Sequence, residues 1–274
     1  MTRRALEERL SAAGIEDARA EANVLFCHFS GMSLAAAMAD READCMSPAL
    51  EEALRRREAR EPLAYILGEA WFFGERYTVT PDCLCPRPDT ERLVEEAIAR
   101  LPKGGVFADF CTGSGCIAIS LALSRPDLSG DAFDLSRGAL AVAEANAATH
   151  GVADRVKFYA RDLLDDALPF PRARYDAIIS NPPYLSADDM KNAQAELAHE
   201  PRIALFGGED GMDFYRFFLS HYRDLLTEGG LFLLEIGAAE GEAMRRLAAE
   251  FAYTCKILSD YAGLDRVAVL IPQG

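Results

Sequence analysis

The hydrophobic pattern of the chain changes near Pro62. Before this residue, apolar side chains recur every three or four positions, as Leu6 and Leu10 do, and this spacing is typical of amphipathic helices. Ser47-Pro48 adds a helix start, with a capping side chain followed by proline at the first helical position. Residues 2–60 are therefore predicted to form a small helical bundle.

The stretch after Pro62 has a different residue composition and a different hydrophobic pattern. Residues 71–80 combine aromatic and β-branched side chains around Gly74, a pattern that predicts a short β-hairpin. A proline-punctuated turn then opens a helix predicted at 92–101. We therefore expect three parts, which are a helical domain at 1–68, a β-hairpin linker at 69–84 and a larger domain at 85–274.

From Val106 onward, strand and helix patterns alternate. Strands are predicted at 106–110, 130–134, 155–159, 175–180, 230–236, 253–258 and 265–271. Helices are predicted at 115–124, 136–149, 188–198, 213–226 and 239–250. This alternation, with short connections, predicts an α/β fold whose mostly parallel sheet is covered on both faces. No helix separates the last two strands, so the final strand is expected to run antiparallel. Seven strands with this ending indicate the Rossmann-like sheet of S-adenosylmethionine-dependent methyltransferases rather than the six-stranded dehydrogenase design.

The charge of the chain limits its partners. It carries 29 Lys and Arg against 44 Asp and Glu, a formal net charge of −15 at pH 7. Residues 1–80 hold 10 basic and 14 acidic residues, so the first part is acidic as well as the remainder. An acidic surface repels phosphate backbones and lacks the cations whose counterion release drives nucleic-acid affinity. A basic protein partner is expected instead, and nucleic acid is disfavoured.

Cysteine and histidine usage points away from a metal site. The seven cysteines and four histidines do not have the spacing of metal ligands.

The sequence also lacks the pattern of a membrane span or an export signal. No segment approaches eighteen consecutive apolar residues, and the first eight residues include acidic side chains and no hydrophobic run. We therefore expect a cytoplasmic monomer with reduced thiols, without metal, export signal or membrane span.

A glycine-containing turn follows the first strand of the predicted sheet. It reads Asp109-Phe110-Cys111-Thr112-Gly113-Ser114-Gly115 and leads into a helix. Glycines there allow positive φ and close approach of the backbone to a ligand. The turn has no lysine, which excludes a phosphate-gripping P-loop, and it lacks the three-glycine dinucleotide fingerprint. The candidate cofactor contacts in this turn are Asp109, Cys111, Thr112, Gly113, Ser114 and Gly115. Asn181, at the end of the fourth predicted strand, is a further candidate cofactor contact.

Two further acids stand at the ends of successive strands. Asp134 closes the second predicted strand, where a carboxylate can reach both hydroxyls of a ribose. Asp162 follows the third strand and can meet an adenine amino group, with Leu163 packing against the ring. A single acid at such a position is more often a helix cap. Three acids in register with the glycine turn predict bound S-adenosylmethionine.

The fourth predicted strand runs into Ser180-Asn181-Pro182-Pro183-Tyr184. The two prolines fix φ and lack N–H groups, so this turn is stiff and presents its carbonyls outward. Asn181 adds an amide oxygen and an NH2 group, and Tyr184 adds a flat ring with a polar tip. The tetrapeptide alone could be a plain proline turn. Beside a cofactor motif it predicts a rigid cradle that grips a planar amide or amino group by its two N–H bonds.

With both motifs in place, the chain resembles the HemK/PrmC family of protein-(glutamine-N5) methyltransferases. The likeness covers essentially the whole chain, including its helical start. It also rests on four shorter segments, which are Leu63-Ala64-Tyr65-Ile66-Leu67-Gly68-Glu69, Pro86-Arg87-Pro88-Asp89-Thr90-Glu91, His199-Glu200-Pro201 and Asp260-Tyr261-Ala262-Gly263-Leu264-Asp265-Arg266. Asn-Pro-Pro-Tyr alone is shared with DNA adenine methyltransferases and some RNA enzymes, but its combination with Pro-Arg-Pro-Asp-Thr-Glu is much more specific. Cys111 departs from the family, which usually has glycine there, and cofactor binding is expected to survive the exchange.

The resemblance implies a function. This family methylates the glutamine of the Gly-Gly-Gln loop in class 1 peptide-chain release factors, with S-adenosylmethionine as donor and S-adenosylhomocysteine as product. It implies that the Asn181 side-chain oxygen and the Pro182 carbonyl accept the two N–H bonds of the glutamine amide, and that Tyr184 packs on the glutamine side chain. Pro183 and Arg87 are assigned to the same substrate slot. The helical domain at 1–68 would dock the release factor, and 85–274 would be the catalytic domain.

Three other functions remain open from the sequence. The same pocket could serve another amide target, such as a ribosomal-protein glutamine, with a different docking surface. An enzyme that methylates adenine or guanine in nucleic acid shares the Asn-Pro-Pro-Tyr motif, but the acidic balance opposes it. A cofactor-binding module without catalysis is the third, and Cys111 is the hint for it.

Overall fold

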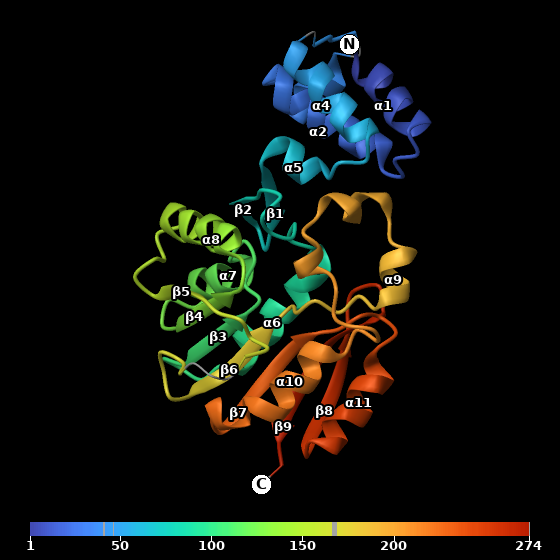
Figure 1. The fold of residues 1–274 in the computed structure, drawn as a ribbon. Coiled ribbons are helices and arrows are strands. Elements are labelled where there is room, and N and C mark those ends of the chain that lie inside the picture. The colour runs from blue at the N-terminus through green and yellow to red at the C-terminus, as the bar shows by residue number, and fades with distance from the viewer. Residues whose placement is uncertain (41, 46, 166–168, 274) are drawn as a thin grey trace. The chain divides into compact units, whose positions relative to one another are not determined.

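The computed structural model describes residues 1–40, 42–45, 47–165 and 169–273 (Figure 1). The chain folds as two compact units. The first, which we call the N-terminal unit, holds Met1–Gly68 together with Gln194–His199. The second, which we call the sheet unit, holds Glu69–Ala193 and Glu200–Gly274. A short piece from the middle of the sequence therefore belongs to the N-terminal unit.

The N-terminal unit is helical, as predicted. Its helices are α1 (Arg3–Ala12), α2 (Ala18–Ser30), α3 (Leu34–Ala39), α4 (Pro48–Glu58) and α5 (Leu63–Leu67). Thr2, Ser33 and Ser47 each cap the helix that follows, because their side-chain oxygens accept a backbone N–H of its first turn. Apolar side chains that lie on one face of their helix, such as Leu6 and Leu10, form the core of this unit.

The prediction of a single helix at 188–198 is wrong over most of that range. The structure has a short α9 (Ala187–Lys191) and then a separate 3-10 turn, η2 (Ala195–His199). Asn192 ends α9, because its side-chain amide bonds back to the Asp188 carbonyl at 2.9 Å. Beyond it, Glu196 pairs with two arginines of the N-terminal unit, Arg57 at 3.0 Å and Arg60 at 2.8 Å. These long-range ion pairs outweigh the local helical pattern.

The sheet unit is built on a seven-stranded sheet in the order β5-β4-β3-β6-β7-β9-β8. The strands are β3 (Val106–Phe110), β4 (Ser129–Asp134), β5 (Val156–Ala160), β6 (Tyr175–Ser180), β7 (Leu226–Glu235), β8 (Tyr253–Ser259) and β9 (Asp265–Pro272). Strands β3 to β7 pair in parallel, and β9 lies antiparallel between β7 and β8. The predicted fold class and the antiparallel final strand are confirmed.

Helices cover both faces of this sheet (Figure 1). One face packs against α6 (Glu91–Arg100), α7 (Cys116–Ser124) and α8 (Arg137–Thr149), and the other against α10 (Asp213–His221) and α11 (Gly241–Glu250). Ile178 and Ile179 are both buried and belong to opposite faces, as the two-residue period of a strand requires. A strand covered on both sides can therefore carry apolar residues at successive positions, as Ile178 and Ile179 show.

Two boundaries of the prediction shift. Helix α10 ends at His221, earlier than the predicted 226, and is followed by a 3-10 turn, η4 (Arg223–Leu225). Strand β7 begins at Leu226 because this residue already pairs with Tyr175, across a register irregularity. Pairing with a neighbouring strand thus decides the boundary, and local pattern does not show it.

The predicted hairpin forms from β1 (Glu69–Phe72) and β2 (Glu75–Thr78). Asn146 of α8 fastens it, because its side chain accepts from the Thr78 N–H at 2.9 Å and donates to the Thr78 carbonyl at 3.0 Å. The same amide donates to the Ser114 carbonyl at 2.9 Å. One buried side chain therefore joins the hairpin to the glycine turn after β3.

Candidate active site

The glycine turn between β3 and α7 is held in place by carboxylates. Asp109 accepts from the Thr112 hydroxyl at 2.6 Å, and Asp134 accepts from the Gly113 N–H at 2.9 Å. Gly115 caps α7 with φ +80°, and a Cβ there would lie 3.0 Å from the Ala143 side chain of the facing helix α8. Only glycine fits this position, so the turn runs close under α8.

Asp109 is fully buried at the end of β3. Burial raises the pKa of its carboxyl to about 7, against the hydrogen bond from Thr112, which favours the ionised form. The carboxyl faces the inside of the turn and does not line the neighbouring cavity. Asp109 therefore shapes the turn from within.

Asp134 lies at the end of β4 and lines the cavity. Besides Gly113, it accepts from the Ser136 N–H at 2.8 Å through its other oxygen. Burial raises the pKa of this carboxyl above its usual range. Each carboxylate oxygen keeps a further lone pair after these two bonds. The side chain is thus fixed by the backbone and can still accept two hydroxyl protons of a ligand.

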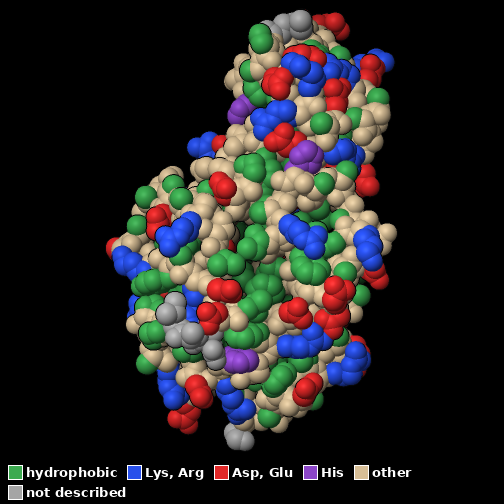
Figure 2. All heavy atoms as spheres, in the orientation of Figure 1, with side chains coloured by type: hydrophobic (Ala, Val, Ile, Leu, Met, Phe, Trp, Pro, Cys, Tyr) green, Lys and Arg blue, Asp and Glu red, His purple; other side chains and the backbone are tan. Residues whose placement is uncertain are grey.

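A cavity of about 630 Å³ opens over these carboxyl ends of the sheet. Figure 2 shows a hollowed strip of hydrophobic side chains in this part of the surface. The volume is in the range of clefts that bury a cofactor-sized molecule. Its walls bring together seven of the predicted site residues, which are Cys111, Gly113, Asp134, Asp162, Leu163, Asn181 and Pro183. The predicted residues outside its walls are Arg87, Asp109, Thr112, Ser114, Gly115, Pro182 and Tyr184.

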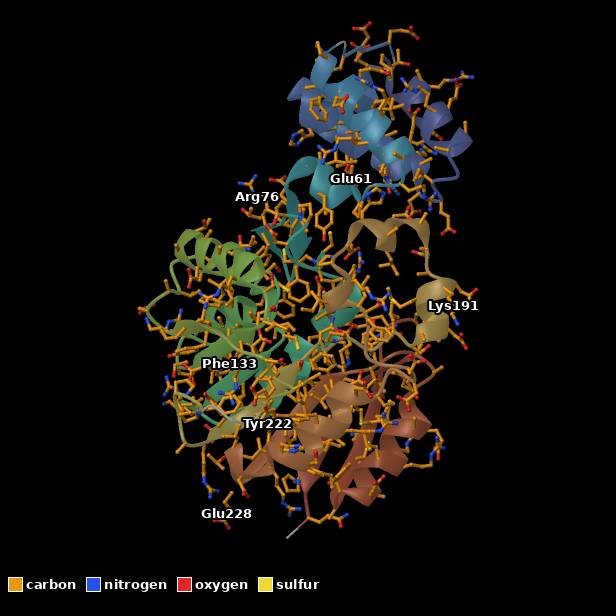
Figure 3. All side chains as sticks on the ribbon, in the orientation of Figure 1. Glu61, Arg76, Phe133, Lys191, Tyr222 and Glu228 are labelled. Atoms are coloured by element: carbon orange, nitrogen blue, oxygen red, sulfur yellow. The ribbon has the colours of Figure 1, made fainter. Side chains whose placement is uncertain are left out.

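The wall at Leu163 is fixed by a buried tyrosine. Tyr222 donates its hydroxyl proton to the Leu163 carbonyl at 3.0 Å. Its ring packs edge-to-face on Phe110, with ring centroids 5.4 Å apart, and Phe110 packs likewise on Phe133 at 5.6 Å. Figure 3 labels Phe133 and Tyr222, which come from β4 and the end of α10. Aromatic packing from distant elements therefore sets the position of one cavity wall.

Asn181 stands at the end of β6 and lines the cavity. Its side-chain NH2 donates to the Thr90 hydroxyl oxygen at 3.2 Å. Thr90 belongs to the short 3-10 turn η1 (Pro88–Thr90), within the segment Pro86–Glu91. This bond engages one N–H and orients the amide, and the amide oxygen is the acceptor that the side chain can offer to a ligand.

The turn at Asn181–Tyr184 packs closely against the backbone of Gly207, which comes from another part of the chain. A Cβ at Gly207 would lie 2.5 Å from the Pro183 carbonyl oxygen and 2.7 Å from the Tyr184 Cα. Leu185 and Gly207 also bond directly, the Gly207 N–H donating to the Leu185 carbonyl at 3.0 Å. The backbone of residues 205–207 therefore supports the turn from behind, and only glycine allows this close approach.

Arg87 is paired with a buried carboxylate. It forms an ion pair with Glu200, whose side chain is fully buried and also accepts from the Cys85 N–H at 3.3 Å. Tyr184 is half-buried, and burial raises the pKa of its hydroxyl above its usual range. These two residues support the neighbourhood of the cavity and do not form its walls.

Sequence reasoning missed three contributors, Thr90, Gly207 and Glu200, as parts of the site. Thr90 and Glu200 lie in two of the segments that carry the family likeness, and each acts through a partner far away in the sequence. Gly207 has φ in a range that any residue adopts, so its requirement comes from the close backbone approach alone. No local pattern carries that information.

The residues of the cavity fit S-adenosylmethionine. The Asp134 oxygens suit a ribose, and Gly113, with φ +56° and open space where a Cβ would point, leaves room for a ligand beside the turn. Asp162 and Leu163 offer an acceptor and an apolar wall for a base. Among the described residues there is no cluster of three or more potential metal ligands. In the same described part of the chain, no helix is long and apolar enough to cross a membrane.

Two sequence families match the chain. The PrmC N-terminal domain matches residues 2–68, and the Methyltransferase small domain matches residues 89–209. The release factor glutamine methyltransferase of Neisseria gonorrhoeae is 45% identical and covers 78% of this chain and 78% of its own length. That of Moorella thermoacetica is 41% identical and covers 94% of this chain and 93% of its own. The ribosomal protein uL3 glutamine methyltransferase of Burkholderia pseudomallei is 39% identical, covering 74% and 68%.

A solved structure supports the fold. A methyltransferase from Pyrococcus furiosus superimposes with a TM-score of 0.53 over 73% of this chain and 89% of its own, at 17% sequence identity. At this identity the likeness concerns the arrangement of the sheet and its helices. The arrangement of the sheet and its helices is therefore shared with one solved methyltransferase structure.

Proposed function

The chain belongs to the release factor glutamine methyltransferase family, and from this membership we propose that it methylates the side-chain amide N5 of the glutamine in the Gly-Gly-Gln motif of class 1 peptide-chain release factors. S-adenosylmethionine is the methyl donor in this proposal. The observation that carries it is that Asn181 lines the same cavity as Gly113 and Asp134. An amide-binding group and a nucleoside-binding group thus share one space.

Five residues would hold the cofactor. Asp134 would accept the two ribose hydroxyl protons, and Asp162 with Leu163 would bind the adenine. Gly113 and Cys111 would line the methionine side, on a turn that Asp109, Thr112, Ser114 and Gly115 shape. The bound cofactor supplies a methyl group on a sulfonium, which is strongly electrophilic.

The chain's own residues would orient the nucleophile. An amide nitrogen is a poor nucleophile, because its lone pair is delocalised into the carbonyl. The Asn181 oxygen and the Pro182 carbonyl would accept its two N–H bonds and hold it in line with the methyl group. These acceptors gain strength as positive charge develops on the nitrogen in the transition state. Pro183 and Tyr184 would enclose the glutamine side chain, while Arg87, paired with Glu200, keeps the supporting loop in place.

Residues 1–68 are proposed to dock the release factor, with 69–84 as a linker and 85–274 as the catalytic domain. Leu34 and Met38 expose about half of their surface on α3 and suit a protein contact. Replacing both by glutamate should lower kcat/KM on the whole release factor and leave turnover of a short Gly-Gly-Gln peptide unchanged. Equal losses on both substrates would contradict the docking role. We propose further that the enzyme works in the cytoplasm as a monomer.

The test of the function is direct. The protein is incubated with S-adenosylmethionine and a class 1 release factor, and mass spectrometry locates any added methyl group. One methyl on the Gly-Gly-Gln glutamine is the expected result. Because a uL3 glutamine methyltransferase is a relative, ribosomal protein uL3 is assayed in parallel as the second candidate. Methylation of uL3 with an unmodified release factor would replace the first proposal by the second.

A further inference from the structure

A buried carboxyl lies beside Asn181 and has no part in the mechanism above. Glu235 is the last residue of β7, and the register pairs Ser180 with Leu234, so Asn181 and Glu235 follow at adjacent strand ends. Glu235 is 1% exposed, and its Oε2 atom has no hydrogen-bond partner among the described residues. Burying a carboxyl group in this way is costly, and such groups tend to have a functional reason.

Thr90 connects this carboxyl to Asn181. It is 2% exposed, its oxygen accepts from the Asn181 NH2 at 3.2 Å, and its hydroxyl favours the ionised form of the Glu235 carboxyl. A hydroxyl has a single proton to donate. When that proton goes to an ionised Glu235, only lone pairs of Thr90 are left for Asn181. The amide must then present its NH2 to Thr90 and turn its oxygen the other way.

We propose that Glu235 and Thr90 are positioning residues for methyl transfer, which together fix the side-chain amide of Asn181 with its oxygen toward the cavity. This inference rests on the proposed function, since it gives that oxygen the substrate amide as its partner. In this proposal the observed bond between Asn181 and Thr90 is continued by a hydrogen bond from the Thr90 hydroxyl to ionised Glu235, so that a chain of bonds runs from Glu235 through Thr90 to Asn181. It extends the site by two residues that do not touch the substrate.

Several groups from neighbouring elements act on Glu235. Burial raises the pKa of its carboxyl to about 7, and the Thr90 hydroxyl is the largest opposing influence. Arg266 on β9 and Arg87 also favour the ionised form, whereas Asp89 opposes it. The tyrosines Tyr184 and Tyr215 and the carboxyl of Glu240 lie in the same neighbourhood. The balance places the change of ionisation close to neutral pH.

Protonation of Glu235 would reverse the chain of bonds. The carboxyl would then donate to Thr90, and the Thr90 proton would point to Asn181. Asn181 would have to present its oxygen to Thr90 and its NH2 to the cavity, where the NH2 of the substrate also lies. Two donors cannot bond each other. Turnover should therefore fall as the pH drops through about 7.

Kinetics on a short Gly-Gly-Gln peptide test the proposal. Thr90→Val removes the hydroxyl at nearly constant volume and should lower kcat about tenfold or more, the effect of losing one oriented hydrogen bond. Thr90→Ser keeps the hydroxyl and should restore most of the turnover. The matched control is Thr227→Val, because Thr227 also donates to a carboxylate, Asp176 at 3.0 Å, at the opposite end of the sheet. Cofactor affinity should stay within about twofold of wild type in all three.

The pH profile separates positioning from simple packing. In the wild type, kcat should decline on the acidic side of about pH 7. In Glu235→Gln this acidic limb should disappear, because the amide does not titrate in this range. If Thr90→Val turns over as fast as Thr227→Val, or if Glu235→Gln keeps the acidic limb, the proposal is wrong.

A second measurement does not need turnover. The side-chain NH2 of Asn181 can be assigned by nuclear magnetic resonance from its loss in Asn181→Ala. It should shift with a midpoint near pH 7 in the full-length wild type and stay constant in Glu235→Gln. A wild-type NH2 that does not titrate, in an enzyme that methylates the peptide, overturns the positioning role. An NH2 that titrates as expected supports the positioning role, even if the wild type leaves the peptide unmodified and only the proposed function fails.

Discussion

Asn181 is the residue on which methyl transfer should depend most directly. Its NH2 is bound to Thr90, and its oxygen is proposed to hold the substrate amide. Asn181→Ala should lower kcat about 10²-fold or more, a loss typical of removing one preorganised electrostatic partner. The fold and cofactor affinity should remain, as measured by thermal unfolding and calorimetry. Asn192→Ala, at the end of α9, serves as the control and should keep full turnover. Full activity of Asn181→Ala would remove this residue from the mechanism.

Cys111 occupies a backbone conformation that favours glycine. Its φ is +59°, and a side chain in this left-handed region costs about 1 kcal/mol. Cys111→Gly should therefore unfold with a free energy about 1 kcal/mol higher than Cys111→Ala, measured by urea denaturation at equal m value. The usual order is the opposite, because glycine gains more freedom on unfolding. An alanine variant as stable as the glycine variant would show that this turn carries no strain.

At the scale of elements, the close contact between Gly207 and the turn at Asn181–Tyr184 makes a sharp prediction. The Cβ of Gly207→Ala would meet backbone atoms of Pro183 and Tyr184, which cannot move aside without shifting the turn. We expect methyl transfer to fall at least tenfold, because displacement of about 1 Å at a reacting group can cost far more. Gly104→Ala is the control. Gly104 also has positive φ, but it has open space and lies at the far end of β3.

These two variants separate stability from geometry. Both should lose some unfolding free energy, Gly104→Ala through its φ of +70° and Gly207→Ala through the clash. Only Gly207→Ala should lose turnover per folded molecule, under conditions where unfolding measurements show both variants to be native. Equal turnover of the two variants would mean that residues 205–207 do not set the position of the turn.

Elements with a strong local pattern were predictable, and contacts between distant segments were not. The predicted strands at 106–110, 130–134 and 175–180 match β3, β4 and β6, so the glycine turn and Asn181 could be placed at one edge of the sheet. The segment 188–198 has a helical pattern and nevertheless divides, because Glu196 pairs with Arg57 and Arg60. Residues 194–199 belong to the N-terminal unit because Glu196 bonds to partners more than 130 residues away in the sequence.

The candidate site shows the same difference between residues with a local signal and residues whose roles depend on distant contacts. Asp134 could be assigned because a carboxylate at a strand end faces the ligand edge of such sheets. Asp109 has the same kind of position and turns inward to Thr112, which the spacing of acids does not distinguish. Thr90 and Glu235 are invisible to local reasoning, because their roles depend on which strand lies beside β6. Strand order is a property of the whole fold.

At the scale of the whole molecule, buried carboxyls make stability depend on pH. Burial raises the pKa of Asp109, Glu235 and Glu240 to about 7. The folded protein therefore keeps protons that the unfolded chain releases near pH 4 to 4.5. Their contribution to stability is fully present below pH 4 and is lost as the pH rises through 7. We expect the free energy of unfolding to decrease by a few kcal/mol between pH 5 and 8.

Glutamine variants locate the source of this slope. Glu235→Gln and Glu240→Gln together should reduce the decrease in unfolding free energy between pH 5 and 8, because an amide binds no proton in either state. The exposed Glu228→Gln should leave it unchanged. The measurement is urea denaturation at half-unit pH steps in constant ionic strength, so that screening of the acidic surface does not vary. A wild-type stability that rises over this interval would mean that these carboxyls are already ionised in the folded enzyme. Positioning by Glu235, which requires this carboxyl to titrate near pH 7, would then be wrong as well.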